Sequence, residues 1–138
     1  MKFLLVQPKK KMLELSILEC ANNQNASYKA MHEAVDGNFE ICSQYFNGLP
    51  QNVDVWCNED CLFRSDLLPV LTYQIKGIDG SPMFGYIKGN LLFTAYNEEG
   101  ETLGLTDDQI FGIGDVLQAM PMVLMTENEK IYPTFYKE

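Results

Sequence analysis

The sequence predicts an α+β fold, with a small, mostly antiparallel sheet and two helices, at about residues 27–36 and 107–119, packed on it. Short apolar segments separated by turn residues indicate the strands. The helical spacing of apolar residues indicates the first helix, and a capping box at Thr106 indicates the second. The chain has 138 residues, of which 46% are hydrophobic and 21% charged, so we expect one domain over residues 1–138.

The first part of the chain predicts a hairpin followed by a helix. Residues 3–6 read as one apolar strand and residues 12–18 as its antiparallel neighbour, with Lys9-Lys10-Lys11 in the loop between them. Ser27 is the expected N-cap of the helix, and Gly37 is the expected stop at its C-terminus. The helix face that we expect to turn inward carries Tyr28, Met31, His32 and Val35.

The middle of the chain predicts further strands and one loop-rich section. Alternating apolar and polar residues indicate strands over residues 38–45 and 53–57. In the second of these strands Trp56 points away from the expected core, because its neighbours on either side are apolar. Residues 70–76 predict another strand, whereas the glycines of residues 77–89 predict a connecting loop or hairpin.

The last part of the chain carries its best local signal, a capping box. The Thr106 hydroxyl can accept a hydrogen bond from the amide of Gln109, whose side chain can return to the amide of Thr106. This arrangement starts the second helix, and Pro121 ends it. Residues 122–125 and 131–136 are candidate strands on either side of an acidic turn.

Three stretches together resemble one known family. Residues 28–40 read as a helix that ends in a Val-x-Gly turn and enters a strand. Residues 55–62 combine a strand with an Asn-Glu-acidic turn and lead to Leu68-Pro69, while residues 89–95 and 105–110 combine a glycine-led strand with a capped helix. These motifs resemble the family called domain of unknown function 3846, small proteins found largely in phages, plasmids and conjugative elements. The resemblance implies a small α+β fold and a mobile-element origin.

The chain is strongly acidic. It has 19 acidic and 10 basic residues and a formal net charge of −9, so we expect no direct binding of nucleic acid. Residues 89–129 hold acidic residues but no Lys or Arg, which predicts an anionic face. Such a face is either a solvated surface or a docking patch for a basic protein partner, including a patch that imitates DNA phosphates. The candidate binding residues are Glu98, Glu99, Glu101, Asp107, Asp108 and the outward-facing Trp56.

The four cysteines are expected to be reduced thiols of a cytoplasmic protein, because no secretory signal opens the chain. The spacing of Cys57 and Cys61 also suits a zinc site, to which His32 could add a nitrogen, but the second tight ligand pair of such sites is missing. We therefore expect no metal and no cofactor. The other two thiols are those of Cys20 and Cys42.

The sequence contains no constellation of nucleophile, base and metal, so we expect a protein that binds rather than catalyses. The first hypothesis is an accessory protein of a mobile element that acts on a macromolecule through its acidic surface. The alternative is a protein that sequesters a small molecule or nucleotide derivative, using residues 77–89 and aromatic side chains. A hydrolase that pairs His32 with a cysteine ranks last. No membrane association is expected, because no apolar run approaches about 20 residues.

Overall fold

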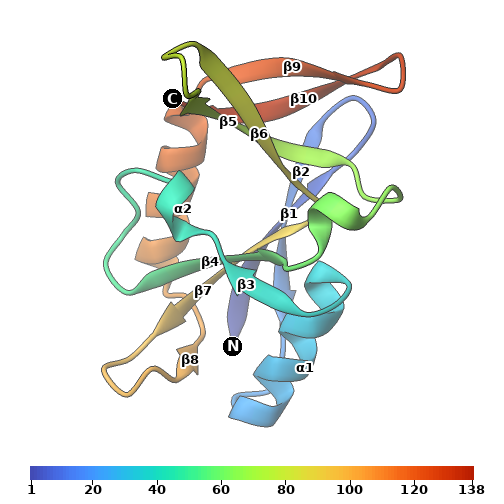
Figure 1. Ribbon diagram of the computed structural model, residues 1–138. Coiled ribbons are helices and arrows are strands. Elements are labelled where there is room, and N and C mark those ends of the chain that lie inside the picture. Colours follow the sequence, from blue (N-terminus) through green and yellow to red (C-terminus); the bar gives the residue numbers. More distant parts are fainter.

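The computed structural model describes residues 1–138, which form two sheets and two α-helices (Figure 1). The predicted α+β class is confirmed, although the strands are divided between two sheets instead of forming one. The strands are β1 Lys2–Pro8, β2 Leu13–Glu19, β3 Phe39–Ile41, β4 Val53–Asn58, β5 Pro69–Lys76, β6 Pro82–Lys88, β7 Leu91–Tyr96, β8 Thr102–Leu103, β9 Met122–Glu127 and β10 Lys130–Lys137. The helices are α1 Gln24–Val35 and α2 Asp107–Ala119.

The larger sheet has the strand order β2-β1-β7-β4-β3, and the short strand β8 also pairs with β7. All of its pairings are antiparallel. The smaller sheet has the order β6-β5-β10-β9, in which β5 and β10 run parallel. The β9–β10 hairpin crosses the top of the molecule in Figure 1, and its turn places Asn128 and Glu129 at positive φ.

Alternation along the central strands divides the apolar residues between two clusters. Val55 and Phe93 lie on the face of the larger sheet that packs against α2 and the smaller sheet, in a cluster of 18 buried residues. Leu92 and Phe3 lie on the opposite face, where α1 covers a cluster of five buried residues. Strand β7 is therefore buried on both faces, which explains why nearly all of its residues are apolar.

Helix α1 begins earlier than predicted. Its N-cap is Asn23, whose Oδ1 accepts a hydrogen bond of 2.8 Å from the amide of Ala26. Ser27, the predicted cap, is instead buried in the first turn, where its hydroxyl donates to the Gln24 carbonyl. The helix ends at Val35 because the next residue, Asp36, adopts the left-handed conformation with φ 59°.

Helix α2 spans residues 107–119 as predicted, and the capping box is confirmed. The amide of Gln109 donates to the Thr106 hydroxyl over 3.1 Å, and the amide of Thr106 donates to the Gln109 side chain over 2.8 Å. Gly112 allows the close approach of Pro50, because a β-carbon there would lie 2.7 Å from the proline ring. Neither helix of the protein is long and apolar enough to cross a membrane.

The segment predicted as one strand over residues 38–45 is a strand only as far as Ile41. A 3-10 turn, Ser43–Tyr45, follows it. The reason is that the Ser43 hydroxyl accepts a hydrogen bond of 2.9 Å from the amide of Val55, replacing the backbone pairing that would continue the ladder.

Candidate functional site

A hollow of about 260 Å³ lies beside α1 on the face of the larger sheet that this helix covers. Its walls are largely aromatic. The rings of Phe39 and Trp56 meet edge to face with their centroids 5.3 Å apart, and Tyr28 meets Phe39 in the same way at 5.4 Å. Tyr96, from β7, is the fourth aromatic residue that lines the hollow.

Trp56 was predicted to point away from the core, and it does lie on the opposite face of β4 from Val55. It is nevertheless half-buried, because α1 packs over this face. Its indole N–H donates to the hydroxyl of Thr94 over 2.9 Å, which fixes the orientation of the ring. The ring therefore forms a rigid wall of the hollow.

Asp54 brings a carboxylate to the same hollow. It lies two residues before Trp56 on β4 and therefore on the same face of the sheet. The three ion pairs of the protein involve Asp36, Asp66 and Glu127, so the charge of Asp54 has no basic partner in the chain. Partial burial raises the pKa of the Asp54 carboxyl.

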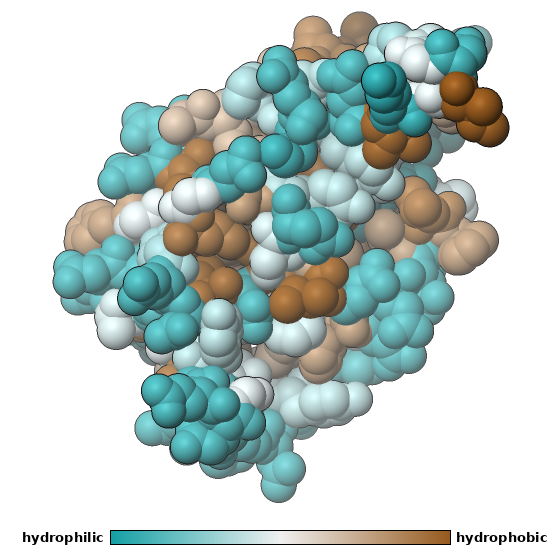
Figure 2. Space-filling view, turned by 60° about the vertical axis from the view of Figure 1, so that its left-hand side comes forward, coloured by the Kyte–Doolittle hydropathy of each residue, from teal (hydrophilic) through white to brown (hydrophobic).

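The β7–β8 turn forms the rim of the hollow, since Gly100 and Thr102 line it. Asn97 organises this turn: its Oδ1 accepts hydrogen bonds from the amides of Glu99 and Glu101 over 3.1 and 2.9 Å. The acidic side chains that neighbour Gly100 therefore project from a fixed loop. The turn lies at the lower end of the molecule in Figure 1, and Figure 2 shows that this end is covered by hydrophilic residues.

The structure thus brings together Trp56 and the segment that contains Glu98, Glu99 and Glu101. Asp107 and Asp108 lie elsewhere, in the first turn of α2, where they complement the positive end of the helix dipole. Asp107 lines a separate surface hollow together with Lys2.

Sequence reasoning missed Asp54, and its spacing from Trp56 is the signal that could have found it. Residues at i and i+2 of a strand share one face. A carboxylate two residues from the aromatic residue already singled out was therefore a candidate for the same surface.

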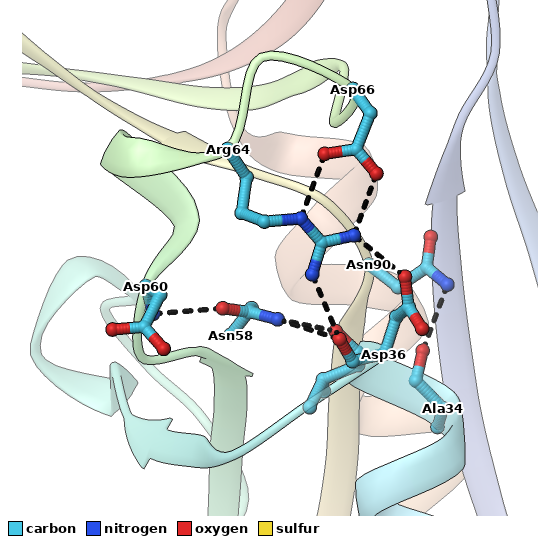
Figure 3. Close-up of polar contacts among 8 residues, drawn as sticks. Ala34, Asp36, Asn58, Asp60, Arg64, Asp66 and Asn90 are labelled. Carbon is cyan, nitrogen blue, oxygen red and sulfur yellow. Dashed lines mark hydrogen bonds and ion pairs between the residues drawn. The ribbon is translucent and has the colours of Figure 1, made fainter.

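A polar network closes the C-terminal end of α1 (Figure 3). The side chain of Asn58 is buried, and its amide nitrogen donates to the carbonyls of Val35 and Asp36, each over 3.0 Å. Its Oδ1 accepts a hydrogen bond of 2.8 Å from the amide of Asp60. Both donor hydrogens of the Asn58 amide are therefore used within the protein, as expected of a structural group.

Arg64 completes the network from the solvent side. Its guanidinium donates to both carboxylate oxygens of Asp66, over 2.7 and 2.6 Å, and to the carboxylate of Asp36 over 2.8 Å. These contacts lower the pKa of Asp66 to about 2. Asn90 adds a hydrogen bond of 2.8 Å to the carbonyl of Ala34. The network unites the helix end, the turn after β4 and the start of β7.

Most residues of this network lie in stretches that resembled a known family, at residues 28–40, 55–62 and 89–95. A family model described as Domain of unknown function (DUF3846) matches residues 1–118. The chain belongs to the DUF3846 family. The match ends within α2, so β9 and β10 lie outside the matched residues. No curated protein and no solved structure matches the chain.

Three of the four thiols of this DUF3846 chain lie away from the hollow. Cys42, Cys57 and Cys61 are buried in the larger cluster, on the opposite face of the sheet from α1 and His32. A hydrogen bond with Cys57, together with burial, raises the pKa of the Cys42 thiol. Burial also raises the pKa of Cys61, so the thiols of Cys42 and Cys61 are protonated at neutral pH. No group of three or more His, Cys, Asp or Glu side chains is placed to hold a metal ion.

Cys20 is the remaining thiol, and it packs against the cluster beneath α1. The ring of His32 lies beside the ring of Tyr28, with 6.4 Å between their centroids. His32 therefore takes part in the aromatic surface of α1.

The section predicted as a connecting loop or hairpin over residues 77–89 is the turn and second strand of the β5–β6 hairpin. Residues 82–88 form β6, and only residues 77–81 form the turn that joins it to β5. Gly85 faces Tyr73 across the hairpin, and a β-carbon at Gly85 would lie 2.2 Å from the tyrosine ring. The glycine therefore makes room for an aromatic ring, which leaves no cradle for a phosphate there.

The raised pKa of Asp54 gives a pH-dependent prediction. A carboxyl with a higher pKa in the folded state than in the unfolded state binds its proton more tightly when folded, so it lowers stability as the pH rises through that window. We expect Asp54→Asn to be more stable than the wild type at pH 7 and equally stable well below the ordinary carboxyl pKa of 3.8. Urea denaturation at both pH values measures this. An Asp54→Asn variant that is less stable at pH 7 would show that the carboxylate is satisfied.

Proposed function

We propose that this DUF3846 protein is a non-enzymatic binding protein that takes a basic side chain of a protein partner into the hollow beside α1. One observation carries the proposal: the half-buried carboxylate of Asp54 has no basic partner in the chain and lines the same hollow as Trp56 and Tyr96. An aromatic wall with a carboxylate is the combination that attracts an ammonium or guanidinium group.

Each part of the hollow matches a part of a lysine or arginine side chain. The apolar stem suits the aromatic and methionine walls, while the charged head suits the carboxylate and the face of an indole ring. The acidic β7–β8 turn adds attraction at longer range, since Glu98, Glu99 and Glu101 belong to no ion pair. Complementary charge of this kind raises the rate of encounter and favours basic partners.

The wider setting of this function rests on the sequence. We expect an accessory protein of a mobile genetic element, because the resemblance described above implies that origin, and we expect it to act in the cytoplasm. The genes that neighbour the coding sequence test the first expectation. Genes of phage or conjugative functions would support it, whereas a chromosomal housekeeping neighbourhood would contradict it.

Calorimetric titration with an acetylated, amidated octapeptide of alternating lysine and glycine tests the binding function. We expect saturable binding that weakens about tenfold in Asp54→Asn and about tenfold in Trp56→Leu, because each substitution removes one element of cation recognition. Asp54→Asn preserves the shape of the side chain. Circular dichroism verifies that both variants are folded.

The matched control removes two negative charges outside the hollow, whereas Asp54→Asn removes one inside it. The double variant Asp107→Asn, Asp108→Asn loses two carboxylates at the start of α2, outside the hollow. We expect its affinity to change less than about threefold, by the general loss of net charge alone. If this control weakened binding as much as Asp54→Asn does, the peptide would be held by net charge and not by the hollow.

A second candidate function, binding of a small molecule or nucleotide derivative through its aromatic part, is favoured by another hollow. It measures about 580 Å³ and lies on the smaller sheet, where Phe84 and Tyr86 of β6 form one wall. These residues belong to the section 77–89 that the sequence had suggested for a ligand. The hydroxyl of Thr72, hydrogen-bonded to that of Thr134 over 2.8 Å, lines the same hollow, which gives the mixture of aromatic and polar groups typical of small-molecule sites.

Thermal denaturation with nucleosides and nucleotide derivatives tests this second function. A ligand of the hollow should raise the melting temperature of the wild type and leave that of Phe84→Ala unchanged. The control is Phe111→Ala, which removes an exposed ring on α2, outside this hollow. An unchanged melting temperature across the library, or an equal shift in Phe84→Ala, would contradict it.

A further inference from the structure

Strand β2 is a long edge strand that lacks the lysine, proline and glycine that often interrupt such edges. It has seven residues, Leu13–Glu19, with no lysine, proline or glycine among them. Leu15 and Ile17 are each 46% exposed. Edge strands of soluble proteins are normally short or interrupted by lysine and proline. In this protein β3 has only three residues, and β6 contains Pro82 and Gly85.

The hydrogen bonds between β1 and β2 show which residues of β2 have free backbone groups. The amide of Lys9 donates to the carbonyl of Met12, and Cys20 and Met1 exchange two hydrogen bonds of 3.0 and 2.8 Å. In an antiparallel ladder every second residue of the strand bonds to the same neighbour. The even-numbered residues of β2 therefore face β1, and the outward N–H and C=O groups belong to Leu13, Leu15, Ile17 and Glu19.

We propose that β2 pairs with β2 of a second copy of this chain, antiparallel, about a twofold axis at Ser16. This register places Leu15 opposite Ile17 and Leu13 opposite Glu19 of the other copy. All four outward residues of each strand then form hydrogen-bonded pairs, with eight N–H···O=C bonds in all. The interface is isologous, so it closes after two copies.

The side chains agree with the same register. Leu13, Leu15 and Ile17 lie on one face of β2, where the first two line an apolar groove of about 730 Å³ between β2 and α2. Pairing would join the three apolar side chains of one copy to those of the other. Lys11 lies two residues before Leu13, so it becomes the diagonal neighbour of Glu19 in the other copy, with opposite charges at both ends of the interface.

The other long unprotected edge, β9, is less suited to a second copy. The amide of Tyr136 donates to the carbonyl of Pro121, so the odd-numbered residues face β10 and only three residues of β9 point outward. Its charged residue, Glu127, is already paired with Lys88 over 2.9 Å. Strand β9 therefore offers fewer hydrogen bonds and no complementary charge pair.

Light scattering coupled to size-exclusion chromatography tests the proposal with the full chain. We expect the wild type to elute with twice its monomer mass of 15.7 kDa at about 0.1 mM. Leu15→Lys places a charge opposite Ile17 of the other copy and sets the two new ammonium groups diagonally across the twofold axis, so this variant should elute as the monomer. Leu124→Lys, the matched control on the β9 edge at 72% exposure, should remain a dimer.

Exchanging the charges of Lys11 and Glu19 gives a second test. Both side chains are exposed, so these substitutions are not expected to affect folding. Lys11→Glu and Glu19→Lys should each weaken dimerisation at least about threefold, and the double variant should restore it. A wild type that is monomeric at this concentration overturns the proposal. A dimer that dissociates in Leu124→Lys but not in Leu15→Lys, or a double variant that is weaker than both single variants, overturns it as well.

Discussion

Phe93→Ala is expected to lower the free energy of unfolding by about 3–5 kcal/mol. Phe93 is completely buried at the centre of β7, opposite Leu4 of β1 on one side and Val55 of β4 on the other. Its ring also meets that of Phe46 edge to face, with 5.5 Å between centroids. The substitution leaves a cavity between the two sheets and α2, which a rigid sheet closes only in part.

Urea denaturation followed by the fluorescence of Trp56, the single tryptophan of the chain, measures this effect. The control is Phe111→Ala, which removes a ring that is 73% exposed and is expected to change stability by less than about 0.5 kcal/mol. Equal losses in the two variants would contradict the assignment of Phe93 to the centre of the core.

Asn58→Ala is expected to cost about 3 kcal/mol of stability, because it removes a buried side chain together with its three hydrogen bonds to the backbone. The carbonyl of Val35 loses its side-chain donor, the carbonyl of Asp36 keeps only the hydrogen bond from Arg64, and the amide of Asp60 loses its acceptor. These groups belong to the end of α1 and the turn after β4, so the substitution loosens the joint between the helix and the sheet.

Two further variants in the same network show how much of the stability loss in Asn58→Ala comes from the burial of its side chain and how much from hydrogen bonding alone. Asn90→Ala removes a single hydrogen bond to the carbonyl of Ala34 and is expected to cost about 1 kcal/mol. Arg64→Gln removes exposed ion pairs and is expected to cost less than about 1 kcal/mol. A contrary result in urea denaturation would be that Asn58→Ala lowers the free energy of unfolding no more than Asn90→Ala does. That result would mean that water replaces the hydrogen bonds of Asn58 at the end of α1, and it would contradict the prediction.

Local chemistry determined which parts of the fold the sequence could predict. The capping box at Thr106 specifies the start of α2 through contacts between residues three apart. The start of α1 was misplaced because several residues with cap-forming side chains follow one another, and only the observed contact selects Asn23 over Ser27. The parallel pairing of β5 with β10 joins residues more than 60 positions apart, and no local pattern encodes it.

The candidate site, too, was predictable where it depends on local sequence and unpredictable where it depends on contacts between distant elements. Alternation along β4 placed Trp56 on the face away from Val55, but the sequence did not reveal that α1 would cover this face and turn it into a hollow. Charge counting found the acidic turn at Glu98–Glu101. It also grouped Asp107 and Asp108 with that turn as one anionic face, whereas in the fold only the turn reaches the hollow and the two aspartates stay at the start of α2, where the capping box had placed them. Acidic residues that are close in sequence can therefore lie on different surfaces, because each strand and helix carries its own residues to a different place in the fold.

The fluorescence of Trp56 tests most directly whether the hollow holds a cation, since no other tryptophan contributes to the signal. Two peptides that differ only in one lysine replaced by norleucine, its uncharged analogue, are titrated into the protein at low salt. The lysine peptide is expected to change the emission saturably and the norleucine peptide to leave it unchanged, because only an ammonium group gains from the indole face and the carboxylate of Asp54. Identical responses to the two peptides, or no response to either, would contradict the proposed recognition of a basic side chain.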